Sequence, residues 1–222
     1  MLTYKYFAQP INNLVTNQTI LYELLLRQWD DCQGRWRVPD SFELTPTELV
    51  QLLDIAINEL NNRHVSVNLT AHQFADPEMQ LAISDYVQAH LLPRELTVEL
   101  VATPQLSALR QMSVGYRAAG VLIAFDDVGS DNLFTQIRTM LPYVNTVKFA
   151  LQNMRPWGTT ITDETIAALK FWFDKAEEYQ MLFTFEGIES ADDIQLAAHF
   201  GITRGQGYYF SKPQLPTTFM VH

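Results

Sequence analysis

Hydrophobic residues recur along the chain in two spacings that alternate with each other. Five short runs rich in β-branched and aromatic residues are expected to be strands: residues 65–69, 97–101, 121–125, 144–149 and 181–185. Between them, apolar positions recur every three or four residues, which is the spacing of helices with one buried face. Because the strand runs are almost continuously apolar, the pattern is typical of a parallel sheet covered by helices.

Several of the predicted helices begin at recognisable capping residues. Thr45 is followed by a proline and, three positions later, by a glutamate, which is a pattern typical of a helix N-terminus. Asp76 and Thr103 also precede prolines and are expected to open two more helices. A long helix is expected over residues 163–179. Ser190, with an aspartate three positions on, predicts a capping box at the start of a further helix.

The alternation of strands and helices continues without a low-complexity linker, a charge block or an internal repeat. The chain has 222 residues, of which 47% are hydrophobic and 18% charged, an ordinary composition for a globular protein. This length is common for one large α/β domain. We therefore expect a single domain over residues 1–222, with the α/β fold of a TIM-like (β/α) barrel.

Charge and cysteine content narrow the possible partners and locations. The formal net charge is −10, which would repel a nucleic-acid backbone, so polymeric DNA or RNA is not expected as a partner. A small anionic ligand remains compatible, because carboxylates that hold divalent cations create a phosphate site. The single cysteine, Cys32, cannot form an internal disulfide, and no signal peptide or membrane span is visible. These features predict a cytoplasmic protein.

Polar side chains fall at or near the C-terminal end of almost every predicted strand. They are Asn68, Glu99, Asp126, Asp127, Lys148, Glu186 and Glu189. The C-terminal strand ends of a barrel form one mouth, so these residues are expected to converge there. Clustered carboxylates repel each other unless a cation compensates, and oxygen ligands suit Mg²⁺ or Mn²⁺ better than zinc. The adjacent Asp126 and Asp127 can bridge two cations about 4 Å apart, the spacing used in phosphoryl displacement.

Each of these residues also has a structural explanation when it is considered alone. Glu99 could be a solvated acid at a strand end, and Asp126 and Asp127 could be turn residues or a helix cap. Asn68 could cap a turn. Lys148 could be a surface lysine, although a lysine among apolar residues in a strand needs a partner. The placement of the whole set at the same end of successive strands favours a single site.

A series of short motifs in a fixed order adds to this interpretation. They are ELLLR at residues 23–27, NLT at 68–70, ELVAT at 99–103, DDVGSD at 126–131, KFA at 148–150, EGIE at 186–189 and QGYYFSKP at 206–213. Together they resemble the EAL-domain cyclic di-GMP phosphodiesterases from about Leu21 to Pro213. So many matches in the family's order make a highly specific signal.

The resemblance implies a role for each matching residue. It implies a first metal site of Glu23, Asn68, Glu99 and Asp126, and a second surrounded by Asp126, Asp127 and Glu186. It implies that Lys148 orients the attacking water, that Arg27 and Gln206 contact the phosphate and guanine ends of the ligand, and that Glu189 supports the site. Two cations, Mg²⁺ or Mn²⁺, would activate a bridging water that opens cyclic di-GMP to linear pGpG.

Several positions depart from the family's motifs. Ala102 and Ala150 stand where the family has acids, and the loop after the paired aspartates carries Val128, Asp131 and Asn132 in place of Phe, Gly and Tyr. In the family, the acid that Ala102 replaces steadies this loop, which also makes dimer contacts. Loss of support around metal ligands commonly changes affinity or activity by about 10 to 100-fold.

Two hypotheses from different classes follow. The leading one is a cyclic di-GMP phosphodiesterase, because the metal and lysine positions match. The alternative is a weak or inactive EAL domain that acts as a cyclic di-GMP receptor or a protein-interaction module, because the loop is degenerate. A homodimer is compatible with either hypothesis.

Overall fold

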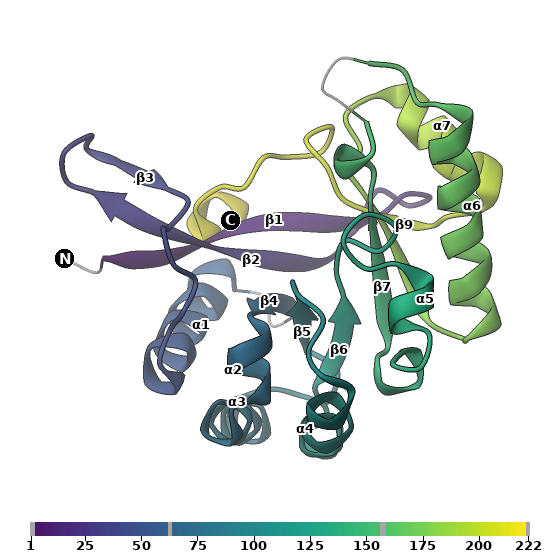
Figure 1. The fold of residues 1–222 in the computed structure, drawn as a ribbon. Coiled ribbons are helices and arrows are strands. Elements are labelled where there is room, and N and C mark those ends of the chain that lie inside the picture. Colours follow the sequence, from purple (N-terminus) through teal and green to yellow (C-terminus); the bar gives the residue numbers. More distant parts are fainter. Residues whose placement is uncertain (1–2, 62–63, 156–158, 221–222) are drawn as a thin grey trace.

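The computed structural model describes residues 3–61, 64–155 and 159–220. Within these residues, eight strands form a closed barrel with helices on its outside (Figure 1). The strands, in their order around the barrel, are β1 (Tyr4–Asn13), β2 (Thr19–Asp30), β4 (Val65–Leu69), β5 (Leu96–Leu100), β6 (Leu122–Phe125), β7 (Thr146–Ala150), β8 (Leu182–Glu186) and β9 (Arg204–Gly205). The predicted α/β fold of TIM-like barrel type is confirmed.

One strand departs from the all-parallel arrangement of a TIM barrel. β1 runs antiparallel to both of its neighbours, β2 and β9, whereas the strands from β2 to β9 are parallel to one another around the rest of the ring. β1 and β2 form a long hairpin, and the ring closes where β1 pairs with β9 (Figure 1). Outside the ring, the short strand β3 (Arg35–Arg37) pairs with the far end of β2.

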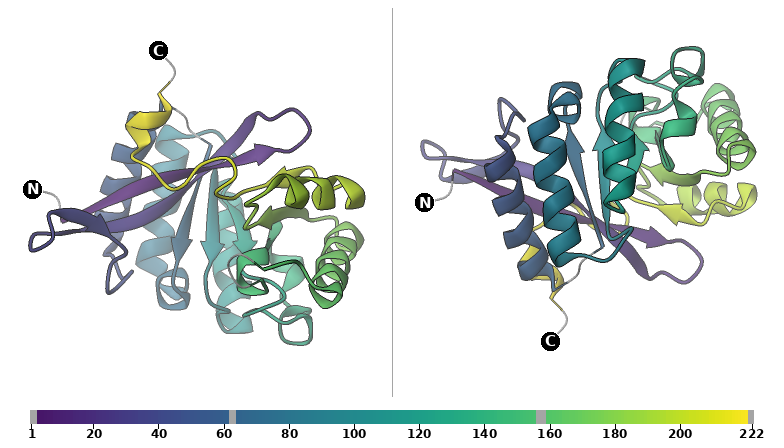
Figure 2. Two further views of the ribbon diagram at one scale, coloured as in Figure 1. Left: turned by 90° about the horizontal axis from the view of Figure 1, so that it is seen from above. Right: turned by 90° about the horizontal axis from the view of Figure 1, so that it is seen from below.

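The helices cover the outside of the barrel. They are α1 (Pro46–Leu60), α2 (Ala71–Ala75), α3 (Pro77–His90), α4 (Leu106–Ala118), α5 (Phe134–Ile137), α6 (Asp163–Glu178) and α7 (Ala191–Phe200), with 3-10 turns η1 (Leu141–Tyr143), η2 (Leu151–Asn153) and η3 (Pro216–Phe219). α1, α3 and α4 lie side by side (Figure 2). No helix in the described part of the chain is both long and apolar enough to cross a membrane.

Most of the predicted helix starts are confirmed. Thr45, Asp76 and Ser190 cap α1, α3 and α7 through side-chain hydrogen bonds to backbone N–H groups. The predicted start at Thr103 is wrong, because α4 begins at Leu106 and its N-cap residue is Gln105. The Thr103 hydroxyl instead donates a hydrogen bond to the side chain of Asn132.

The five predicted strands all form, with boundaries that shift by at most two residues. The largest shift is at β7, which begins at Thr146, because Leu141–Tyr143 forms a 3-10 turn and the Asn145 side chain accepts a hydrogen bond from the Ile123 N–H. The sequence did not predict β1, β2, β3 or β9.

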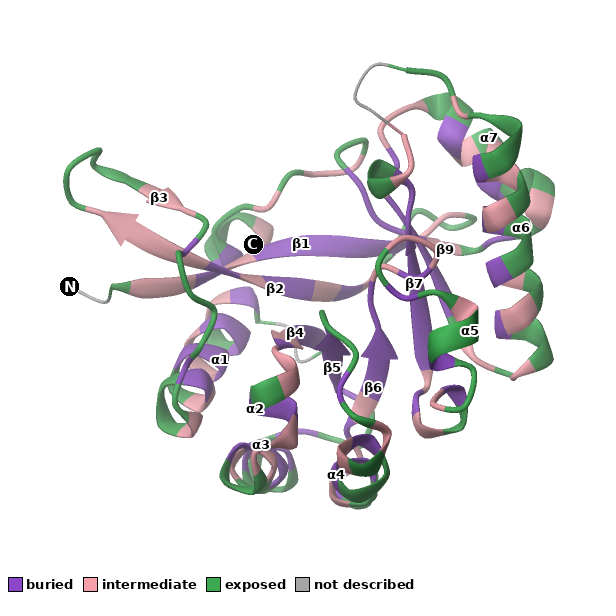
Figure 3. Ribbon diagram, viewed as in Figure 1, coloured by how far each residue is buried: buried purple, intermediate pink, exposed green. Residues whose placement is uncertain are grey.

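The parallel strands β4 to β8 are buried at nearly every position, but the polarity of their side chains alternates and separates two environments (Figure 3). In β4, Val65, Val67 and Leu69 are fully buried against the helical layer. Residues of opposite parity point into the barrel, since successive side chains of a strand face opposite sides. There the interior is polar: on their strands, Ser66, Thr97, Thr146 and Thr184 each lie two residues before Asn68, Glu99, Lys148 and Glu186, respectively. The barrel thus directs its ionisable groups to the C-terminal mouth.

Candidate metal centre

A buried lysine forms the centre of the barrel mouth. The Lys148 Nζ atom lies 2.5 Å from Glu99 Oε2, 2.7 Å from Glu186 Oε1, 3.4 Å from Asp126 Oδ1 and 3.6 Å from Glu23 Oε2. These five residues come from β2, β5, β7, β8 and the residue that follows β6, so strand register brings them together from distant parts of the sequence. One ammonium group therefore faces four carboxyl groups.

The excess of acids over bases changes how readily each group ionises. Burial, together with the charges of Glu23 and Asp126, raises the pKa of Glu99 to about 7 against the opposing effect of Lys148. Burial likewise raises the pKa of Asp126 and, more strongly, that of Glu186. The pKa of each of these three acids is raised because the single ammonium group does not offset burial and the repulsion between the carboxylates.

Glu23 and Lys148 show the opposite balance. Burial disfavours ionisation of Glu23, but the charge of Lys148 and hydrogen bonds from Asn68 and Gln206 outweigh it and lower its pKa. Burial also disfavours the charged form of Lys148, yet the surrounding carboxylates raise its pKa well above the ordinary value. The ion pair at the centre of the mouth is therefore maintained in the absence of metal.

The carboxylates form two groups that share one member. Glu23, Glu99 and Asp126 each offer an oxygen atom within 4.8 Å of the others, and so do Asp126, Asp127 and Glu186. Asp126 belongs to both groups, as expected for a carboxylate that bridges two cations. The two groups match the two metal sets that the resemblance implied.

The amide of Asn68 has the geometry of a further ligand. Its Nδ2 atom donates to Glu23 Oε1 at 2.8 Å, while its Oδ1 atom is buried and has no hydrogen-bond partner among the described residues. A buried acceptor without a partner is costly in a folded protein, and a bound cation would satisfy it. The donor set of carboxylate and amide oxygens fits Mg²⁺ or Mn²⁺.

Asp127 lies in a turn and is held from outside the barrel. Its backbone has φ of +51°, and its Oδ1 atom accepts a hydrogen bond of 2.8 Å from Asn153 Nδ2 in η2. Burial and the charge of Asp126 raise the pKa of Asp127 to about 6. The sequence did not point to Asn153, because its contact with Asp127 depends on how two loops fold against each other.

The predicted ligand-binding residues surround this cluster at different distances. Gln206 is buried and donates from Nε2 to Glu23 Oε2 at 2.8 Å, so it contacts the acidic cluster directly. Arg27 lies four residues beyond Glu23 on β2, where its guanidinium group sits 5.9 Å from the centre of the Phe7 ring. Glu189 lies 3.6 Å from Arg155, outside the cluster itself.

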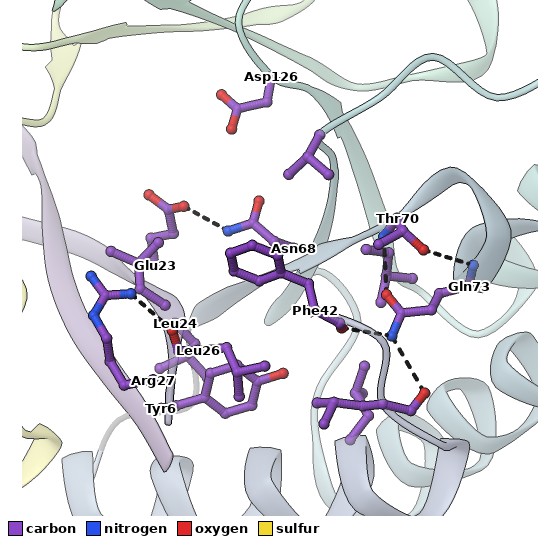
Figure 4. Close-up of a pocket in the computed structure, with 15 residues that line it drawn as sticks. Tyr6, Glu23, Leu24, Leu26, Arg27, Phe42, Asn68, Thr70, Gln73 and Asp126 are labelled. Carbon is purple, nitrogen blue, oxygen red and sulfur yellow. Dashed lines mark hydrogen bonds between the residues drawn. The ribbon is translucent and has the colours of Figure 1, made fainter. Parts of the chain in front are cut away.

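Two cavities flank the acidic cluster, and Glu23 and Asp126 line both of them. The first, of about 300 Å³, has largely apolar walls and includes Arg27 and Phe42 (Figure 4). The second, of about 350 Å³, is more polar and is lined by Asp127, Glu186, Glu189, Gln206 and Tyr208, among others. The cluster thus lies between two spaces large enough for parts of a ligand.

Two of the structural explanations for single residues are wrong: that Glu99 is a solvated acid and that Lys148 is a surface lysine. Glu99 is 2% exposed and Lys148 is 1% exposed, so neither is a solvated or surface residue. Asp127 does lie in a turn, but its carboxylate also belongs to the second acidic group. Of the residues predicted from strand ends, all except Glu189 therefore converge on one place.

The sequence pattern of the EAL domain matches residues 3–213. The chain belongs to the EAL domain family. It is 25% identical over 229 residues to an Escherichia coli protein named "Probable cyclic di-GMP phosphodiesterase PdeB", and 24% identical to another named "Probable cyclic di-GMP phosphodiesterase PdeD". These matches cover 92% and 95% of this chain but 41% of each relative, so the chain spans about two fifths of their length.

Solved structures of EAL domains share the fold. The MucR phosphodiesterase in complex with c-di-GMP superposes with a TM-score of 0.80 at 19% identity, covering 98% of this chain and 100% of the other. The FimX EAL domain from Pseudomonas aeruginosa, bound to c-di-GMP, gives a TM-score of 0.75 at 20% identity, covering 96% and 91%. At this level of identity the likeness establishes the barrel fold of this EAL domain.

Proposed function

We propose that this EAL domain hydrolyses cyclic di-GMP to linear pGpG with two divalent cations, Mg²⁺ or Mn²⁺. The observation that carries the proposal is the pair of carboxylate groups that share Asp126, an arrangement suited to displacement at phosphorus. Membership of the EAL family and the names of its curated relatives support the same substrate.

The residues divide into two overlapping ligand sets. Glu23, Asn68, Glu99 and Asp126 would hold the first cation, and Asp126, Asp127 and Glu186 the second. When bound, the cations supply the positive charge that lowers the pKa of a water molecule and neutralises the phosphate oxygens. Hydrogen bonds of 2.8 Å from Asn68 and Gln206 fix the Glu23 carboxylate, so this ligand is oriented before any cation arrives.

Lys148 would orient the attacking water. Its ammonium group lies within 3.6 Å of a carboxylate oxygen of both acidic groups, and it remains protonated because carboxylates surround it. It can therefore donate a hydrogen bond to a water oxygen or to a phosphate oxygen at the same place. Asp127 and Glu186 line the polar cavity, and one of these carboxylates, ionised when the cations are bound, would accept the proton that the water loses.

The two cavities support a ligand with two bases. A cyclic dinucleotide carries its phosphates between two nucleobases, and the acidic cluster lies between the two cavities. Arg27, in the apolar cavity, would contact a phosphate, while Gln206 and Glu189 line the other side. The shared lining by Glu23 and Asp126 is what would place a phosphodiester bond at the cations.

The test is hydrolysis by the purified protein. Cyclic di-GMP is incubated with Mg²⁺ or with Mn²⁺, and pGpG is separated by chromatography, with the variant Glu99→Gln as the matched control. We expect turnover by the wild type and at least about a hundredfold less by the variant. Absence of turnover with either metal, in protein shown to be folded, would contradict the proposal.

The altered motifs favour a second candidate, a non-catalytic receptor for cyclic di-GMP or a protein-interaction module. Ala102 and Ala150 provide no carboxylate at positions where the family has one. Calorimetry with cyclic di-GMP and Ca²⁺ separates these functions: binding without turnover indicates a receptor, and neither indicates a protein-interaction role. One domain over residues 1–222, a cytoplasmic location and a homodimer stay predictions from the sequence.

A further inference from the structure

The loop that carries Asp126 and Asp127 follows an unusual backbone path. Asp127 has φ of +51° and Gly129 has φ of +95°, so two of the four residues after β6 adopt left-handed conformations. A non-glycine residue in this region costs free energy and persists when its surroundings hold it in place. The position of these two carboxylates therefore depends on the contacts that fix the loop.

Asn132 makes those contacts from the far end of the loop. Its side chain is 2% exposed, and its Nδ2 atom donates to the carbonyl oxygen of Asp126 at 2.6 Å. Its backbone N–H donates to the carbonyl oxygen of Asp127 at 3.2 Å. One residue thus bonds the main chain of both aspartates, and its buried amide spans the loop from Asn132 back to β6.

Thr103 connects this amide to the neighbouring strand. The Thr103 hydroxyl, just beyond β5, donates to Asn132 Oδ1, so both ends of the Asn132 amide are bonded. Ala102, the preceding residue, carries only a methyl group where the resemblance implies a loop-supporting glutamate. The link between the end of β5 and the loop is therefore made by Thr103 rather than by position 102, and it runs through the side-chain amide of Asn132.

We propose that Asn132 and Thr103 form a latch that positions Asp126 and Asp127 for divalent cations. The inference rests on the proposed two-metal function, and both members are positioning residues that act through the aspartates. It also explains two departures from the family's motifs together, because Asn132 supports the loop that the methyl group of Ala102 cannot support. Fixing the ligands in advance reduces the ordering that metal binding would otherwise require.

The test measures Mn²⁺ binding directly, by electron paramagnetic resonance titration of the full chain without any nucleotide. Asn132→Leu removes both amide groups at similar volume, and Thr103→Val removes only the hydroxyl at an exposed position. We expect the dissociation constant for Mn²⁺ to rise about tenfold or more in Asn132→Leu, and to rise in Thr103→Val. The conservative variant Thr103→Ser, which keeps the hydroxyl, should bind as the wild type does.

Thermal unfolding of the metal-free proteins separates positioning from mere stability. If Thr103→Val unfolds like the wild type but binds Mn²⁺ more weakly, the latch is supported, even when Asn132→Leu does not fold. Unchanged Mn²⁺ binding in Thr103→Val, weakening in Thr103→Ser equal to that in Thr103→Val, or no Mn²⁺ binding by the wild type would overturn it. If Mn²⁺ binding by the wild type and the variants is as expected but the wild type does not hydrolyse cyclic di-GMP, only the proposed function is contradicted.

Discussion

The acidic cluster has one half on barrel strands and one half on the loop after β6, and the two halves are held in different ways. Glu23, Glu99 and Lys148 lie on barrel strands, where paired neighbours fix their backbone on both sides. Asp127 lies on a loop and depends on side-chain bonds from Asn132 and Asn153 to the loop. Strand register thus fixes one half directly, while the other half needs additional polar residues, and substitutions should affect the two halves differently.

The largest effect is expected at Lys148. Lys148→Met removes the ammonium group from among four buried carboxyl groups, so the metal-free protein should lose roughly 3–5 kcal/mol of unfolding free energy. Mn²⁺ should restore part of that stability, since it supplies the missing positive charge. Urea unfolding with and without Mn²⁺ measures both effects. Lys170→Met, at an exposed lysine of α6, is the control and should change little.

Glu23→Ala should abolish metal-dependent turnover with a smaller loss of stability. The substitution removes one charge from a repulsive cluster, but it also leaves the amides of Asn68 and Gln206 without their acceptor. We expect a cost of about 1–3 kcal/mol, set by the two unpaired donors. Turnover assays and urea unfolding check the two parts, and undiminished turnover would show that Glu23 has no role in the reaction.

Glu99 is expected to affect the pH dependence of stability. Its pKa is about 7 in the folded protein and near 4.5 in the unfolded chain, so the folded state binds more protons between these values. The stability of the metal-free protein should therefore fall as pH rises from about 4.5 through about 7. Glu99→Gln should flatten this decline in urea unfolding measured across that range. An equally steep decline in the variant would exclude Glu99 as its source.

The smallest effect is expected on the loop half. Asn153→Ala removes the hydrogen bonds to Asp127 and Ser130 from a position near the surface. The free energy of unfolding should therefore change by less than about 1 kcal/mol. Mn²⁺ affinity should nevertheless fall severalfold, because Asp127 loses a group that orients it. A loss of stability without a change in Mn²⁺ affinity would contradict the distinction between the halves.

The sequence indicated the strand-borne half because its chemistry follows a regular pattern. A barrel places the C-terminal ends of its parallel strands around one mouth, so Asn68, Glu99 and Lys148 could be assigned to one site without any contact being known. Glu23 and Gln206 entered only through the resemblance, because β2 and β9 were not recognised as strands. β9 has two residues, too few for any periodic signal.

The loop half could not be predicted in the same way. Asn132 was recognised as a departure from the family's motif, but its bonds to Asp126 and Thr103 depend on the path of a loop with left-handed residues. Thr103 itself resembled a helix cap, because a proline follows it. The hydroxyl is used instead for a partner 29 positions away, which no local pattern indicates.

The closure of the barrel by β1 bears on how the protein is made. Glu23 needs Gln206 from a strand end 183 positions later, and Ala8 exchanges backbone hydrogen bonds with Gln214. A chain emerging from the ribosome would therefore hold most of its helices and parallel strands before the ring can shut. The site for cations would form among the last events of folding, so an unfinished chain should have little affinity for them.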